Sequence, residues 1–316
     1  MLHAYYADHI EAIGTSEKQF SLKELEAFKT LDDAREAVID NKVESLLWQG
    51  FEDWVQYLRN HLKLTAGYLD PVMDEMTEVF LRRNIHVHNN GIVNSIYLSK
   101  VTPPLAENIK GGQGLPVTRE YLDRAIDLFE LYFILLASEL WKKLKKGDHE
   151  RTRLLIDISY ERMLGRRWNV AGGISRFVSE DKSAVEHDRT IGTVNYWQCM
   201  KWSGKFDEVK VEVENADFSG KSVEFRLCLH ALRGEADAFF ELLPRALKSE
   251  ALTVADLRVW PVFQEMRKRA EFDRFLHEET APKPTMVLEQ HADVAQKEGE
   301  DRPRGSKKGG MPRTSA

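Results

Sequence analysis

The sequence has few cysteines, no long apolar run and no excess of basic residues. Its two cysteines, Cys199 and Cys228, are too few for a disulfide framework or a cysteine-rich zinc site, and this sparse use favours a reducing compartment. No apolar run reaches the roughly 18–20 residues that span a bilayer, and the N-terminus has no basic or apolar region typical of a signal peptide. We therefore expect a soluble, cytoplasmic protein with no membrane partner.

The charge balance excludes one class of nucleic-acid-binding protein. The chain has 45 Lys and Arg against 51 Asp and Glu, a formal net charge of −6. A protein whose surface is basic throughout, as in histones, is therefore excluded, although a local basic patch is not.

The sequence does contain enough apolar material for sizeable cores, with 42% hydrophobic residues in 316. A single core stops growing near about 250–300 residues, so the length predicts about two domains. We predict an all-α protein with a helical bundle over residues 1–146, whose central part is 40–146, and a helical-repeat domain over 147–280. Residues 281–316 are rich in Pro, Gly, Lys and Glu, and a disordered tail is predicted there.

Periodicity and capping residues predict the main helices of the first region. Residues 43–64 repeat apolar side chains at spacings of three and four, which predicts one long amphipathic helix. Asp70-Pro71 predicts the start of a second helix, which runs to about His88 and ends at Asn89-Asn90-Gly91.

Three further segments complete the predicted bundle. Ser21 and Glu24 form a capping box, which predicts a helix start near Leu22. Residues 99–117 are rich in Pro and Gly and predict a loop. Thr118 then caps a last long helix, which ends in a basic cluster.

The second region contains a repeat of about thirty residues. Residues 202–209 are echoed by 232–239, and in each copy a glycine, Gly204 or Gly234, separates two apolar helices. A further apolar helix is predicted from Val259 to Phe272. The pattern resembles tetratricopeptide helical hairpins, which implies a concave surface for a protein partner such as an antitoxin. The alternative is a plain helical accessory domain without a ligand.

Helical winding of residues 72–88 separates three faces at 100° per residue. It places Arg83 in the middle of an apolar arc, where a guanidinium is unusual without a partner or a function. It places Arg82, with Glu75 and Glu78, on a polar arc that we expect to face solvent. Asn84 and His88 share a third face, whereas His86 lies at the edge of the polar arc and is expected to be a surface residue.

These residues carry a resemblance to a known family. Arg83-Asn84-x-x-x-His88 resembles the R-x(4–6)-H motif of HEPN-domain proteins, and the passage from VHNNGIVNSIYL to the helix containing Tyr121 is similar to theirs. The resemblance covers roughly residues 40–146. It implies a metal-independent endoribonuclease that needs no cofactor, acts as a homodimer and serves as a toxin or antiphage-defence effector, with Arg83, Asn84 and His88 as its catalytic residues.

The chemistry of these side chains suits RNA cleavage. RNA carries its own nucleophile in the 2′-hydroxyl, and its attack yields a 2′,3′-cyclic phosphate. An imidazole with a pKa near about 6.5 can take that proton or protonate the leaving 5′-oxygen. A guanidinium can stabilise the charge that builds on the phosphate, and Asn84 can hold the imidazole or a phosphate oxygen.

The same residues also permit an inactive protein. Arg83 would then be neutralised by a buried carboxylate and His88 would cap the helix end, which leaves a scaffold that binds a protein or nucleic acid. His86 and His88 point about 200° apart and cannot easily share a metal ion, so no metal site is predicted. The basic cluster of Lys142, Lys143, Lys145 and Lys146 is either a weak RNA-binding patch or a solvated helix end.

Overall fold

The computed structural model describes residues 2–13 and 20–280, and within these ranges helices joined by turns and loops make up the fold. The prediction of an all-α protein is confirmed. The pairing of Ile92 with Gly114 is an isolated β-bridge, and no strand is present in the described ranges. The predicted tail, 281–316, lies outside these ranges.

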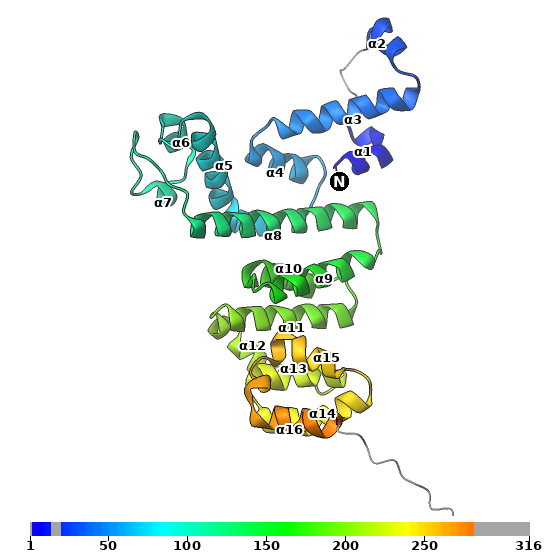
Figure 1. The fold of residues 1–316 in the computed structure, drawn as a ribbon. Helices are drawn as coiled ribbons and strands as arrows, with labels where there is room; N and C mark the ends of the chain where they lie inside the picture. Colours follow the sequence, from blue (N-terminus) through cyan, green and yellow to red (C-terminus); the bar gives the residue numbers. More distant parts are fainter. Residues whose placement is uncertain (1, 14–19, 281–316) are drawn as a thin grey trace, which may run out of the picture.

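In the described residues of the first half, seven shorter α-helices lie on one side of the long helix α8 (Figure 1). Single 3-10 turns at Ile10–Ile13 and Gly67–Val72 join some of them. The helices are α1 (Leu2–Asp8), α2 (Leu22–Ala27), α3 (Leu31–Leu47), α4 (Phe51–Asn60), α5 (Met73–His88), α6 (Ser95–Lys100), α7 (Pro103–Ala106) and α8 (Arg119–Leu144).

The second half stacks further helices on the opposite side of α8 and continues away from it (Figure 1). Short 3-10 helices lie at Phe206–Glu208, Pro261–Phe263 and Met266–Lys268. The α-helices are α9 (Glu150–Leu164), α10 (Trp168–Glu180), α11 (Glu186–Trp202), α12 (Lys210–Asn215), α13 (Val223–Arg233), α14 (Ala236–Lys248), α15 (Val254–Val259) and α16 (Ala270–Thr280).

Several local signals predict helix ends correctly. Ser21 and Glu24 form the expected capping box at the start of α2, and the Thr118 hydroxyl accepts a hydrogen bond from the Tyr121 N–H at 3.2 Å. Gly204 and Gly234 end α11 and α13 in the left-handed conformation, with φ of 77° and 76°. Each capping contact lies within a few residues of sequence, which is why the sequence alone specifies it.

The single helix predicted over residues 43–64 is wrong. The chain leaves the helix after Leu47 and restarts at Phe51, with Gly50 extended at φ −72° and ψ 163°. The Asp53 carboxylate accepts a hydrogen bond from the Gly50 N–H at 3.2 Å and so caps the new helix. The break turns α4 into the bundle, so that Phe51 and Val55 are buried while Leu47 stays exposed.

Three other predicted segments also differ from the structure. Pro71 lies inside a 3-10 turn, so α5 begins at Met73 rather than at Asp70. The predicted loop over 99–117 contains the end of α6 and all of α7. The predicted apolar helix from Val259 to Phe272 is instead two 3-10 turns followed by the start of α16.

Helix α8 connects the two halves of the molecule by packing on both. Leu136 and Leu140 belong to apolar clusters of the first half. Leu131 and Ile134 pack on a cluster that includes Val170 and Ile174 of α10. The predicted boundary at residue 146 lies next to Gly147, which follows α8 and has a φ of 78°.

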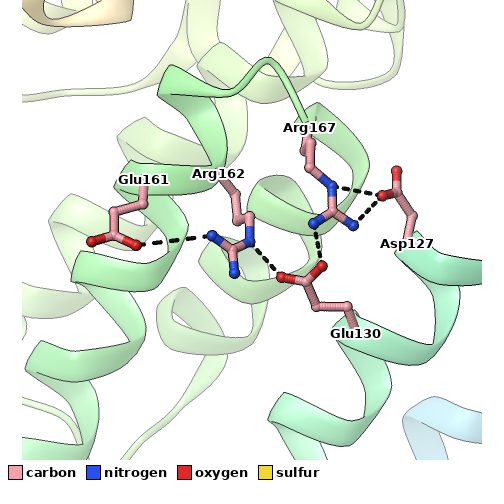
Figure 2. Close-up of polar contacts among 5 residues, drawn as sticks. All are labelled: Asp127, Glu130, Glu161, Arg162 and Arg167. Atoms are coloured by element: carbon pink, nitrogen blue, oxygen red, sulfur yellow. Dashed lines mark hydrogen bonds and ion pairs between the residues drawn. The ribbon is translucent and has the colours of Figure 1, made fainter. Parts of the chain in front are cut away.

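Ion pairs reinforce this junction (Figure 2). Arg162 and Arg167 both donate to the Glu130 carboxylate of α8, and the Arg167 Nε also donates to Asp127 Oδ1 at 2.8 Å. Burial opposes ionisation of Glu130, but the hydrogen bonds from the two guanidiniums lower its pKa below the ordinary value. The carboxylate is therefore charged at neutral pH and ties α8 to α9 and to the start of α10.

Candidate functional site

The end of α5 is closed by the turn that the sequence predicts. The N–H groups of Asn89 and Gly91 donate to the Ile85 carbonyl at 2.8 and 3.0 Å. Asn90 and Gly91 have φ of 52° and 74°, the left-handed conformation that a side chain other than Asn or Gly disfavours. This turn positions the last residues of α5, which include the predicted site.

The polar arc of α5 faces the interior, which contradicts the predicted solvent exposure. Glu78 is only 5% exposed, and its Oε1 accepts hydrogen bonds from Arg82 Nε and from the Tyr97 hydroxyl, each at 2.7 Å. Its Oε2 accepts a hydrogen bond from the Tyr121 hydroxyl at 2.8 Å. The arc is buried because α6 and the start of α8 cover it with these two tyrosines.

Arg82 completes this buried network. Its guanidinium lies 4.0 Å from the centre of the Tyr121 ring and donates to the Pro116 carbonyl at 3.2 Å. Burial, and next the hydrogen bond to Glu78, raise the pKa of both Tyr97 and Tyr121, so both phenols stay protonated at neutral pH. Every charged group in the network has a partner, which indicates a structural role.

His86 fastens the loop after α5 to the helix. It is exposed, as predicted, but its Nε2 lies 2.8 Å from the Leu115 carbonyl oxygen. The ring also lies against Gly91, where an added Cβ would come within 2.9 Å of the His86 Cε1. His86 is therefore exposed and also holds the loop against the helix.

Arg83 is exposed, although the winding places it on the apolar arc. Its guanidinium donates to the Asn84 side-chain oxygen at 3.0 Å, so the two side chains meet at the surface. Residues 1–146 contain six arginines. The other five, Arg35, Arg59, Arg82, Arg119 and Arg124, pair with carboxylates, whereas Arg83 makes no ion pair with any residue in the described ranges.

His88 is exposed at the last position of α5 and makes no hydrogen bond or ion pair to the part of the chain that the structure describes. Asn84 lies one turn before it on the same side of the helix. Arg83, five residues earlier, is rotated by about 140° around the helix axis. Within one copy of α5, Asn84 therefore lies beside Arg83 and one turn from His88. The side chains of Arg83 and His88 do not point to a common position.

A hollow of about 890 Å³ lies beside Arg83 and Asn84. Its floor is made by half-buried or buried rings of α4, α5 and α8. Its rim carries exposed apolar side chains, of which Trp48 is 83% and Phe133 is 40% exposed. Val87, one turn after Arg83, is 56% exposed. The hollow is lined by Leu47, Trp48, Phe51, Trp54, Val79, Phe80, Phe129 and Phe133.

The four lysines at the end of α8 are not an equivalent cluster. Lys142 pairs with the buried Asp181 carboxylate at 2.8 Å, and Lys143 donates to the Leu62 carbonyl. Lys145 and Lys146 are exposed. The latter two make no ion pair or side-chain hydrogen bond in the described ranges.

Neither a metal site nor a membrane span is found in the described ranges. No three His, Cys, Asp or Glu side chains gather closely enough there to hold a metal ion. No helix in this part of the chain has the length and apolar character to cross a bilayer.

Comparison with known proteins places this geometry in no family. No protein-family model, curated protein or solved structure matches the chain.

Sequence reasoning missed two features of this region. The Glu78 network was missed because its partners, Tyr97 and Tyr121, lie 19 and 43 residues away. The exposure of Trp48 was missed because residues 43–64 were treated as one helix. The local signal for the break is Gly50 followed three residues later by Asp53, whose carboxylate caps the new helix.

Proposed function

We propose that this protein is a metal-independent endoribonuclease of the HEPN type, which cuts RNA through a 2′,3′-cyclic phosphate. The observation that carries the proposal is Arg83, an exposed guanidinium with no carboxylate partner in the described ranges. A guanidinium left open in this way can bind a phosphate in two-pronged geometry. The exposed imidazole of His88, on the same helix, supplies a proton acceptor or donor.

The proposed step balances with two imidazoles, one neutral and one protonated, and a guanidinium. A neutral His88 imidazole takes the proton of the 2′-hydroxyl, and the 2′-oxygen forms a bond to phosphorus. The bond from phosphorus to the 5′-oxygen breaks, and a protonated imidazole supplies the proton to that oxygen. Arg83 stabilises the charge on the non-bridging oxygens, and Asn84 holds the guanidinium by the hydrogen bond described above.

Two imidazoles are needed for this step, and one chain offers one at the site, so the proposal includes a homodimer. The exposed apolar rim around Arg83 supports it, since exposed apolar patches mark interaction surfaces. A second copy seated on Trp48, Val87 and Phe133 would bring a second His88 near the first Arg83. The two copies would then supply one acid and one base.

The test is cleavage of RNA by the purified protein in EDTA. We expect the wild type to leave 2′,3′-cyclic phosphate ends. His88→Ala should lower the rate by about 10²–10⁴, the usual contribution of a general acid or base. Arg83→Ala should lower it by about 10²–10³, the usual contribution of one charge-stabilising donor. Arg83→Lys should rescue little, because an ammonium lacks the planar fork.

The matched controls are Arg119→Ala and His149→Ala, which remove exposed side chains elsewhere on the surface. Both should cleave at the wild-type rate. Cleavage that survives in His88→Ala, or that is lost equally in the two controls, contradicts the proposed site. Toxicity of the expressed wild-type gene, and its loss in His88→Ala, would support a toxin or antiphage-defence role.

The dimer is tested separately by the molar mass in solution. Trp48→Glu places a charge in the proposed contact and should give a monomer that no longer cleaves RNA. Val211→Glu changes another largely exposed apolar side chain, on α12, and should leave the dimer intact. A wild-type protein that cleaves RNA as a monomer contradicts this part of the proposal.

A second candidate function is an inactive scaffold, and the angle between Arg83 and His88 favours it. Side chains about 140° apart on one helix do not meet at one phosphate unless a second copy supplies the missing group. A scaffold would bind RNA or a protein partner, such as an antitoxin on the helical repeats, without cleaving. Absence of cleavage together with unchanged RNA binding in His88→Ala would favour this function.

A further inference from the structure

Two adjoining hollows lie where α8, the start of α10 and the end of α11 meet in the stack of helices (Figure 1). Their volumes are about 570 and 670 Å³, each within the range of about 300–1,000 Å³ that is usual for small-molecule sites. The residues that line both hollows are Trp168, Asn169, Ser203 and Lys205. We call the two hollows together the α8–α10 groove. No step of the proposed RNA cleavage uses it.

Aromatic rings line the larger hollow. Tyr132 of α8, Phe177 of α10 and Tyr196 of α11 are half-buried there. Trp168 is also half-buried and packs on an apolar cluster that α9, α10 and α11 share. Its side chain makes no ring stacking, cation–π contact or hydrogen bond with a described residue, although it lines both hollows. Trp168 is therefore available to a flat ligand.

Two cations without a carboxylate partner line the smaller hollow. Arg166 and Lys205 are exposed, and neither makes an ion pair or a side-chain hydrogen bond in the described ranges. Arg166 follows α9 and has a φ of 57°, a conformation that is uncommon for a residue other than Gly or Asn. Lys205 follows Gly204, whose left-handed turn comes directly after α11. Both cations thus project from turns that end helices.

The other charged side chains of the groove form ion pairs, apart from Glu208, which lines only the larger hollow. The pairs are Asp123 with Arg119 at 3.6 Å, Asp127 with Arg167, and Glu180 with Arg176 at 2.9 Å. Helix dipoles of both signs meet here, from the ends of α9 and α11 and the start of α10, so the side chains decide the sign of the potential. The smaller hollow therefore has a surplus of positive charge from Arg166 and Lys205.

A phosphate group beside a flat ring system matches these features. A phosphate monoester carries a charge of about −1.5 to −2 near neutral pH, so it can engage both cations. The arginine fork can bind two of its oxygens, and the lysine adds a second positive charge. Stacking of a base on an aromatic side chain is a common way to hold a nucleotide. The side chain of Asn169, which is exposed and lines both hollows, offers a donor and an acceptor to the base or the sugar.

We propose that the α8–α10 groove binds a nucleotide, a planar base joined through a sugar to a phosphate. The phosphate is held by Arg166 and Lys205, and the base lies against Trp168 in the larger hollow. All three residues are exposed or half-buried, so a ligand in the groove reaches them. The nucleotide is either free or one unit of a single-stranded RNA, and the test separates these two sources. The site is independent of the proposed ribonuclease site.

The test is calorimetric titration of the full chain with adenosine 5′-monophosphate, adenosine and ribose 5-phosphate. The nucleotide should bind with one site per chain. Each fragment should bind at least about tenfold more weakly, because adenosine lacks the phosphate and ribose 5-phosphate lacks the base. Affinity of either fragment equal to that of the nucleotide overturns the proposal.

A 2′-O-methyl hexaadenylate separates the two sources, since it lacks the free 2′-hydroxyl and is not cleaved by the proposed step. Mononucleotide binding that the hexamer does not exceed in affinity assigns the site to a free nucleotide. Tighter binding of the hexamer, weakened by the variants below, assigns it to a strand of RNA. No saturable binding of either probe at millimolar concentration overturns the proposal.

Two variants remove the unpaired cations. Arg166→Asn introduces a residue that tolerates the left-handed conformation, and Lys205→Gln keeps a long polar side chain. Each should weaken binding of the nucleotide or the hexamer at least about tenfold. The matched controls are Lys63→Asn, at another exposed cation with a φ of 50°, and Lys182→Gln, at an exposed lysine outside the groove. Both controls should bind as the wild type does. Unchanged binding in Arg166→Asn and Lys205→Gln overturns the assignment.

Trp168→Leu tests the contact with the base. Leucine keeps an apolar side chain on the core but removes the ring, so affinity for the nucleotide should fall about 5- to 150-fold, the usual effect of losing one stacking contact. Affinity for ribose 5-phosphate should stay unchanged. Equal nucleotide affinity in this variant and the wild type overturns the placement of the base. The comparison of the three probes on the wild type stands even if the variant fails to fold.

Discussion

Arg82 and Arg83 are adjacent in the sequence, yet α5 places them in opposite environments. Arg82 points inward to a buried carboxylate, two phenols and a backbone carbonyl. Arg83 points outward, and in the described ranges its only side-chain hydrogen bond is to Asn84. The comparison shows that one helix can carry two arginines with different roles. The Arg82 guanidinium, whose partners are all within the protein, holds the bundle together, and the Arg83 guanidinium, which has no carboxylate partner in the described ranges, is open to a ligand.

The inward side should be the more sensitive to substitution. Glu78→Ala leaves the Arg82 guanidinium buried without its carboxylate and removes the acceptor of both tyrosine hydroxyls. Removing one partner of a buried ion pair costs about 3–5 kcal/mol, so we expect the free energy of unfolding in urea to fall by that amount. Glu75→Ala, whose partner Arg124 is largely exposed, should cost about 1 kcal/mol or less. Equal losses of stability in the two variants would contradict the inference that the buried Glu78 pair stabilises the bundle more than the exposed Glu75 pair.

A similar contrast occurs at the end of α8, and it predicts the next largest effect. Asp181 is buried and accepts hydrogen bonds from Lys142, Arg151 and Ser183, whereas Lys145 and Lys146 nearby are exposed. Asp181→Asn keeps the shape but removes the charge that two cations face. We expect a loss of about 2–3 kcal/mol in the free energy of unfolding at neutral pH, against a few tenths for Lys146→Ala.

The effect of Asp181→Asn should depend on pH in a defined direction. Burial opposes ionisation of Asp181, but the hydrogen bonds from Lys142, Ser183 and Arg151 lower its pKa far below the ordinary value. Its stabilising contribution is therefore complete above the unfolded pKa, about 3.9, and is lost as the pH falls below it. The stability difference between wild type and variant should shrink in urea titrations from pH 6 to about pH 3. A constant difference would show that the charge is not what stabilises the junction.

The outward side of α5 should show the smallest effect on stability. Arg83→Ala and His88→Ala remove exposed side chains with no ion pair in the described ranges, so each should change the free energy of unfolding by about 0.5 kcal/mol or less. The measurement is urea denaturation, made on the same preparations as the RNA assays. A loss of several kcal/mol in Arg83→Ala would assign that residue a structural role and would leave the proposed site resting on His88.

The sequence determined the features that depend on near neighbours. The caps of α2 and α8, the left-handed end of α5, and the glycine turns after α11 and α13 follow from side chains within a few residues of each helix end. The helical winding of residues 72–88 also correctly placed Glu78 and Arg82 on the same face of the helix. Their contact is an i, i+4 pair, which any straight helix produces.

Only the tertiary structure decided which face of α5 points inward. A polar arc looks like a solvent face in the sequence, because charged side chains are rarely buried unless they are paired. Here Tyr97 and Tyr121 arrive from α6 and α8 to supply the pairing, and Arg83 is left at the surface beside a hollow made by α4 and α8. Burial depends on residues that lie far away in the chain. The periodicity of one segment therefore does not predict which of its faces is buried.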